Sequence, residues 1–138
     1  MSDKPDKWVE AVTKLIKLTQ AGELKWSAAK TDKKTNREDI RIETVFLTKL
    51  KNRILRLYKY SYMIEEPGPY DRMFSTDFYL ASKRKYPYWA SSIILEFIDE
   101  DGRSLWTFPQ SNVLNDLLGA VQYQVAGVDE FLKEILED

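Results

Sequence analysis

Two long segments of alternating hydrophobicity, separated by two turn-forming residues, constrain the fold of this chain more than any other feature. They cover residues 40–50 and 53–64, with Lys51 and Asn52 between them. Alternation with a period of two is typical of β-strands, and a two-residue connection pairs such strands as an antiparallel hairpin. If the turn has two residues, Leu50 lies opposite Arg53, and the rest of the register follows.

This register divides the side chains of the hairpin between two faces, because neighbours along a strand point in opposite directions. We expect one face to pack into a core and the other to carry a row of tyrosines. The first face receives Ile42, Phe46, Leu55, Leu57 and Met63. The second receives Val45, Leu47, Ile54, Arg56, Tyr58, Tyr60 and Tyr62.

Hydrophobic periodicity predicts a helix before the hairpin. Apolar residues recur at helical spacing over residues 6–21, with Asp6 or Asp3 as the N-cap and Gly22 as the stop signal. Residues 23–29 then read as a short strand, and residues 30–39 as a polar loop.

The segments after the hairpin complete the fold. Residues 65–71 contain Pro-Gly-Pro and are expected to form a loop, and residues 74–80 an edge strand or a short helix. Two strands, joined by a turn in which Gly102 takes positive φ, and then two amphipathic helices are predicted. The strands are expected at residues 90–98 and 103–108, and the helices at 111–126 and 128–136.

The predicted architecture is a single α+β domain spanning residues 1–138. An N-terminal helix precedes an antiparallel meander of about five strands, and two C-terminal helices follow, because strands joined by short turns pair with their neighbours in sequence. The three apolar helix stripes are expected to cover one face of the sheet, which leaves the tyrosine-bearing face at least partly open. Trp8, Trp26 and Trp106 fall on apolar stripes and are expected in the core.

The segment Leu18-Thr19-x-x-Gly22-x-Leu24-x-Trp26, with the later strand-turn-strand and closing helix, resembles a pattern of small uncharacterised bacterial domains. These domains open with a helix ending in this motif and continue as a β-meander. The resemblance implies a similar fold. It implies no activity, and no site residue is transferred from it.

The residue types exclude several kinds of chemistry. The chain contains no His and no Cys, and its five glycines are isolated, so disulfides, thiolate nucleophiles and phosphate-binding glycine loops are absent. The remaining acid–base candidates are Glu96, Asp99, Asp101 and Asp77, and we expect Glu96 to face solvent near a sheet rim. We therefore expect a non-enzymatic protein without metal or cofactor. No signal-peptide-like or membrane-spanning apolar segment is apparent, which favours a cytoplasmic protein without membrane partners.

Charge is distributed unevenly along a chain whose net charge is only −1. Residues 25–60 hold eleven basic and four acidic side chains, whereas residues 103–138 hold two basic and six acidic ones. The basic third either attracts an anionic partner or is balanced within the fold by the acidic helices.

Two binding functions follow from these patterns. The first is a protein-interaction or dimerisation module, because Tyr, Trp and Arg are favoured at interfaces; its contact residues would be Arg56, Tyr58, Tyr60, Tyr62, Tyr86, Tyr88 and Trp89. The alternative is a single-stranded nucleic-acid-binding domain that uses the same face with Lys49, Lys51, Arg53, Lys83, Arg84 and Lys85. The aromatic segment 70–89 would be either a contact arm or a cap on the open end of the sheet.

Overall fold

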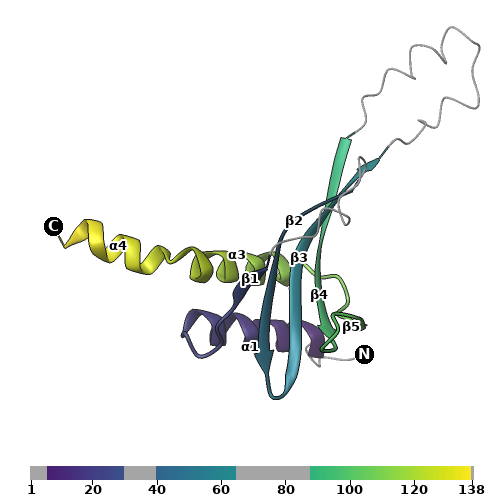
Figure 1. Ribbon diagram of the computed structural model, residues 1–138, viewed down its shortest axis with the longest axis horizontal. Helices are drawn as coiled ribbons and strands as arrows, with labels where there is room; N and C mark the ends of the chain where they lie inside the picture. Colours follow the sequence, from purple (N-terminus) through teal and green to yellow (C-terminus); the bar gives the residue numbers. More distant parts are fainter. Residues whose placement is uncertain (1–5, 30–39, 65–87, 138) are drawn as a thin grey trace, which may run out of the picture.

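The computed structural model describes residues 6–29, 40–64 and 88–137. The described strands form one antiparallel sheet in sequence order (Figure 1). The predicted α+β fold, with a helix, a five-stranded meander and two further helices, is therefore confirmed. The elements are α1 (Lys7–Gln20), β1 (Ser27–Ala29), β2 (Ile40–Leu50), β3 (Arg53–Ile64), β4 (Tyr88–Ile98), β5 (Ser104–Thr107), α3 (Val113–Ala126) and α4 (Val128–Leu136).

The β2–β3 hairpin turns through two residues, as predicted. Lys51 and Asn52 both have positive φ, 50° and 66°. Two such residues form the turn whose twist matches that of paired strands. Leu50 consequently lies opposite Arg53. The predictions for residues 30–39, 65–71 and 74–80 lie outside the described residues.

A β-bulge in β2 changes one of the predicted faces. Val45 lies opposite Tyr58, but Ile42 lies opposite Tyr60. The chain therefore advances three residues along β2 where it advances two along β3. The extra residue reverses the alternation in β2. The prediction that Ile42 shares a face with Phe46 is therefore wrong, and Ile42 lies on the tyrosine-bearing side.

Helices α1 and α3 pack side by side across one side of the sheet (Figure 1). The sheet residues beneath them are buried, with Leu57 and Leu95 at 0% exposure. The apolar side of α3 that faces the sheet is also buried, because Leu117 and Val121 are 0% exposed. The core comprises Val12, Leu15, Leu24, Trp26, Phe46, Leu55, Leu57, Ile93, Leu95, Phe108, Leu114, Leu117, Leu118 and Val121.

Helix α4 does not join this core, so the prediction that three helices cover the sheet is wrong. It follows α3 after the single residue Gly127, whose left-handed conformation (φ 70°) ends α3. From there α4 runs away from the sheet to the C-terminus (Figure 1). No residue of α4 is buried.

The end of α1 explains why the first strand is shorter than predicted. Asp6 caps α1 by accepting a hydrogen bond from the Trp8 N–H, and Gly22 has φ +77°. The N–H groups of Glu23 and Leu24 then both donate to the Leu18 carbonyl. These bonds close the helix end instead of pairing with β2, so β1 begins only at Ser27.

The three tryptophans that were expected in the core have different environments. Trp26 is buried as predicted, and Trp8 packs against the core. Trp106 is half exposed, so its expected place in the core is wrong. Its ring stacks on that of Trp8 with a centroid separation of 5.9 Å, at the margin of the core where the edge strand β5 leaves it partly open.

Candidate functional site

The side of the sheet turned away from α1 and α3 carries the predicted tyrosines, and we call it the tyrosine face. Its members follow from the register, because residues directly opposite in an antiparallel ladder point to the same side. They are Ile40, Ile42, Val45, Leu47 and Lys49 of β2; Ile54, Arg56, Tyr58, Tyr60, Tyr62 and Ile64 of β3; and Tyr88, Ala90, Ser92, Ile94, Glu96 and Ile98 of β4.

The centre of the tyrosine face is a row of phenol rings along β3. Tyr58, Tyr60 and Tyr62 are all half-buried. The rings of Tyr60 and Tyr62 lie 5.5 Å apart at an interplanar angle of 34°. Val45 and Ile94 flank Tyr58 on the neighbouring strands. Aliphatic side chains therefore surround the tyrosines, and the face is largely apolar.

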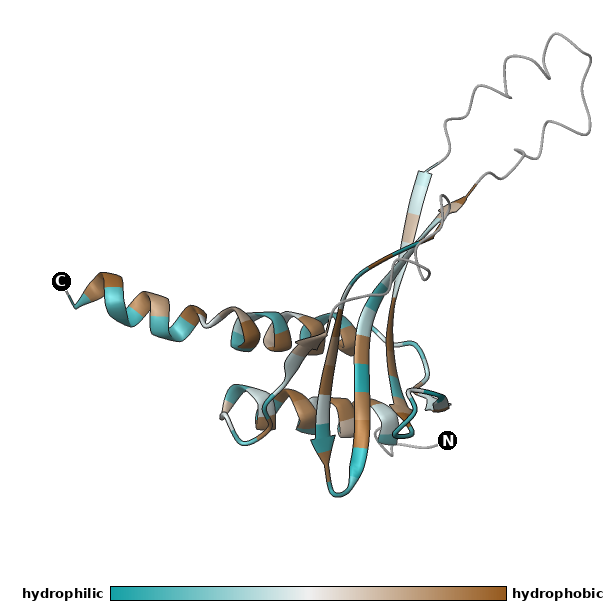
Figure 2. Ribbon diagram, in the orientation of Figure 1, coloured by the Kyte–Doolittle hydropathy of each residue, from teal (hydrophilic) through white to brown (hydrophobic). Residues whose placement is uncertain are grey.

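No described helix packs over the tyrosine face (Figure 1). Hydrophobic residues run along β2 and also occur on β3 and β4 in the same sheet (Figure 2). One side of each strand supplies the core beneath α1 and α3, and the other supplies the tyrosine face. A largely apolar sheet face over which no described helix packs is typical of an interaction surface.

One end of the tyrosine face holds an ion pair between β3 and β4. Glu96 lies opposite Arg56, and Arg56 donates from Nε to Glu96 Oε1 over 2.6 Å and from Nη1 to the Gly102 carbonyl over 3.0 Å. Glu96 has the predicted direction, shared with Ile94 and Ile98. It does not face solvent, however, because it is only 3% exposed. The expectation of a solvent-facing Glu96 is wrong because its partner and the β4–β5 turn enclose it.

Tyr58 is next to this pair and responds to it. Burial raises the pKa of the Tyr58 phenol above 10.0, and the Glu96 carboxylate raises that pKa further, while the Arg56 guanidinium opposes the change. The Arg56 Cζ lies 5.9 Å from the centre of the Tyr58 ring. Tyr58 is therefore held as a neutral phenol, which donates or accepts hydrogen bonds and packs against apolar groups.

The other predicted interface residues do not all lie on the tyrosine face. Tyr88 lies opposite Ile64 on the tyrosine face. Trp89 lies opposite Met63 on the other side of the sheet, where the Arg41 Cζ is 4.4 Å from its ring centre. Tyr86 lies outside the described residues. The structure thus unites Arg56, Tyr58, Tyr60, Tyr62 and Tyr88 on one face and separates Trp89 from them.

The basic residues predicted to bind nucleic acid also lie on different parts of the hairpin. Lys49 is on the tyrosine face and Lys51 is in the hairpin turn. Arg53 lies on the opposite side, with its Cζ 5.8 Å from the Phe97 ring centre. Lys83, Arg84 and Lys85 lie outside the described residues.

Helix α4 is a second apolar surface, which the sequence-based site prediction missed. Phe131 is 57% exposed and Leu136 is 78% exposed. With Val128, Leu132 and Ile135 they form one stripe at helical spacing. The apolar periodicity was visible in the sequence, but periodicity does not say what a helix packs against.

A hydrogen bond links the last turn of α3 to the first turn of α4. The Tyr123 hydroxyl donates to Asp129 Oδ1 over 2.6 Å. This hydrogen bond raises the pKa of Tyr123, because ionisation of the phenol would remove the donor. No residue of the apolar stripe of α4 is buried.

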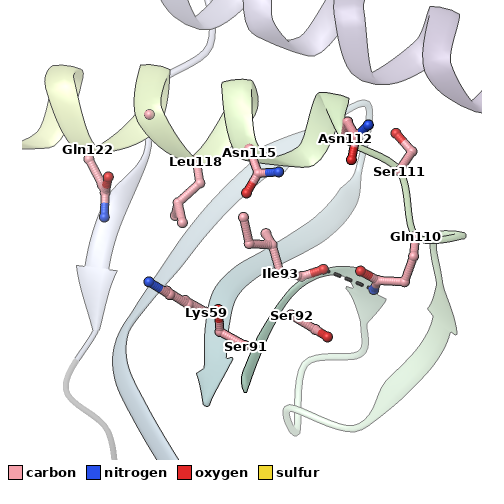
Figure 3. A pocket seen from close by; sticks show the side chains of 11 residues that line it. Lys59, Ser91, Ser92, Ile93, Gln110, Ser111, Asn112, Asn115, Leu118 and Gln122 are labelled. Atoms are coloured by element: carbon pink, nitrogen blue, oxygen red, sulfur yellow. Dashed lines mark hydrogen bonds between the residues drawn. The ribbon is translucent and has the colours of Figure 1, made fainter. Parts of the chain in front are cut away.

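A polar cleft of about 470 Å³ lies on the helix side of the sheet, between β4 and the start of α3 (Figure 3). Gln110 crosses its edge and donates to the Ile93 carbonyl over 3.0 Å. The described lining residues offer one cation, Lys59, together with hydroxyl and amide groups from Ser91, Ser92, Ser111, Asn112, Asn115 and Gln122. These groups suit hydrogen bonding to a polar molecule, but the cleft does not contain the tyrosines.

Within residues 6–29, 40–64 and 88–137, no three acidic side chains gather as a metal site. None of the helices described combines the length and the apolarity that crossing a bilayer requires. Comparison with protein-family models, curated proteins and solved structures finds no match.

Proposed function

We propose that this chain is a protein-interaction module that self-associates through the tyrosine face. The observation that carries the proposal is a sheet face over which no described helix packs and in which aliphatic residues surround the Tyr58–Tyr60–Tyr62 row. Tyrosine combines a large apolar ring with a polar end, so it is favoured where a surface alternates between water and a partner.

The energetics favour association over solvent exposure. Apolar surface removed from water contributes roughly 25 cal/mol per Å², and complete burial of one aliphatic or aromatic side chain contributes about 1.5–3 kcal/mol. The face has eight Ile, Leu and Val residues besides its tyrosines. Covering the part of these side chains that is still exposed is favourable and opposes the entropy lost on association.

The charge of the face also suits a polypeptide partner. Arg56 is paired with Glu96. The described cation of the face outside this pair is Lys49, at the hairpin end. A protein surface docks over the neutral centre without burying an unpaired charge.

The proposal is tested by light scattering on the full chain. The expected mass is near twice 16.2 kDa at concentrations where Tyr60→Asp is monomeric. Ser61→Asp is the matched control, because it adds the same charge to the same strand but on the opposite side of the sheet. Wild-type protein that remains monomeric, or a dimer that both variants leave intact, contradicts the proposal.

Single-stranded nucleic acid is the alternative partner, and one measurement separates it. Binding of a mixed oligonucleotide that weakens steeply with salt would indicate contacts to phosphates. We expect no such salt-dependent binding at concentrations where the chain dimerises.

A further inference from the structure

Two apolar surfaces of the described chain lie outside its buried core. One is the tyrosine face, and the other is the stripe of α4 formed by Val128, Phe131, Leu132, Ile135 and Leu136. A sheet face and an amphipathic helix are the two surfaces that commonly cover each other in α+β domains. In this chain α1 and α3 already cover the other side of the sheet in that way.

The charges around the two surfaces are complementary. The hairpin formed by residues 40–64 carries six basic side chains and one carboxylate. Residues 128–137 of the helix carry four carboxylates and one lysine. Three of these cations, Arg41, Arg53 and Lys59, point to the opposite side of the sheet, and Arg56 is paired with Glu96. Lys49 on the tyrosine face and Lys51 in the adjacent turn are therefore the described hairpin cations placed to meet the carboxylates of α4. Attraction between these opposite charges favours this pairing over two acidic helices or two basic hairpin ends meeting.

The helix does not reach the tyrosine face of its own chain. Gly127 alone joins α4 to α3, and α3 packs on the opposite side of the sheet. Nine helical residues span only about 14 Å, which is too short to pass around the sheet. In the structure α4 runs away from the sheet (Figure 1).

We infer that α4 of one copy packs its apolar stripe on the tyrosine face of a second copy, and that the second copy returns the same contact. This inference rests on the proposed self-association and names the element that occupies the face. A reciprocal contact of this kind closes a symmetric dimer in which each α4 covers part of the tyrosine face of the other copy.

A mixing experiment tests the inference on the full chain. One variant, Tyr60→Asp, breaks the tyrosine face and keeps α4. The other, Leu132→Glu with Ile135→Glu, breaks the stripe and keeps the face. Each variant alone is expected to be monomeric by light scattering. Their equimolar mixture is expected to form a 1:1 dimer, because an intact helix then meets an intact face once.

Two controls accompany the mixture. Lys133→Glu changes the net charge of α4 by the same two units as the double variant and lies off the apolar stripe, so it is expected to stay dimeric. Because Leu132 and Ile135 are exposed, at 39% and 50%, the double variant is expected to keep the wild-type thermal unfolding of the monomer by circular dichroism.

Three outcomes overturn the inference. A mixture that stays monomeric shows that the intact helix of one variant does not bind the intact face of the other. A double variant that dimerises while Tyr60→Asp does not leaves the proposed function standing and removes α4 from the contact. A wild-type chain that is monomeric throughout contradicts both.

Discussion

Arg56 and Glu96 lie opposite each other on β3 and β4, and the arginine approaches one carboxylate oxygen with both Nε and Nη2, at 2.6 and 2.5 Å. The side chain of Glu96 is only 4% exposed, whereas that of Arg56 is 25% exposed. A pair of this kind contributes little when intact, but removing one partner leaves the other charge without compensation.

Glu96→Gln is therefore expected to lower the free energy of unfolding by about 2 kcal/mol, below the range for fully buried pairs because Arg56 retains some solvent. Urea denaturation measures the change. Glu100→Gln is the matched control: Glu100 is exposed in the adjacent turn, and its substitution is expected to change stability by less than about 0.5 kcal/mol. Equal stability of the two variants would mean that the pair is not enclosed.

Gln124 joins α3 to the segment that follows α1. Its side-chain amide donates to the carbonyls of Thr19 and Leu24 and accepts from the Trp26 N–H, at 2.8–2.9 Å. Gln124→Ala leaves these backbone groups unsatisfied and is expected to cost about 2 kcal/mol in thermal or urea unfolding. Gln122→Ala, at an exposed site on the same helix, is expected to be nearly neutral. A similar effect of both substitutions would contradict this role.

Two glycines are expected to respond to alanine with opposite signs. Gly119 lies within α3 and a Cβ there meets no atom within 4 Å, so Gly119→Ala is expected to stabilise the chain by up to about 1 kcal/mol. Gly22 has equal space but a φ of +77°, so Gly22→Ala is expected to destabilise by about 1 kcal/mol. Melting temperatures that move in the same direction would contradict the backbone conformation described.

The raised pKa of Tyr58 predicts that the stability of the folded chain falls at alkaline pH. Its pKa is raised above 10.0 in the folded chain, first by burial and then by Glu96. Its contribution to stability is therefore fully present below pH 10 and is lost as the pH rises through the folded pKa. Tyr58→Phe retains the ring without the ionisable hydroxyl. The stability of this variant relative to wild type is expected to improve above pH 10, as measured by urea unfolding at several pH values. A difference that does not change with pH would contradict the raised pKa.

The sequence predicted those elements that local chemistry determines. The Lys51–Asn52 turn and the Asp6 cap follow from propensities of neighbouring residues, and they are confirmed. The tyrosines of β3 point to the same face, as expected, because alternate residues of a regular strand lie on one side of the sheet.

The structure differs from the sequence-based prediction where contacts between residues distant in sequence determine the conformation. The bulge before Val45 reverses the side of Ile42, and no single residue there signals an extra position. Glu96 is enclosed by residues distant in sequence, so alternation gives its direction without its burial. The stripe of α4 predicts an amphipathic helix in any context, including one that packs on another chain.

The motif at the end of α1 has a structural explanation. The Trp26 indole N–H donates to the Thr19 hydroxyl over 3.0 Å, and that hydroxyl donates to the Leu15 carbonyl. Gly22 provides the reversal that brings Trp26 back to α1. The spacing of threonine, glycine and tryptophan is therefore explained by this corner of the fold.

The central claim is that the tyrosine face is covered by a second copy. Hydroxyl-radical labelling at increasing protein concentration tests it most directly, with the extent of modification measured at Tyr60. We expect modification of Tyr60 to fall as dimer forms, while that of the half-exposed Trp106 on β5 stays constant. Modification of Tyr60 that does not change with concentration, in parallel with Trp106, would contradict the account.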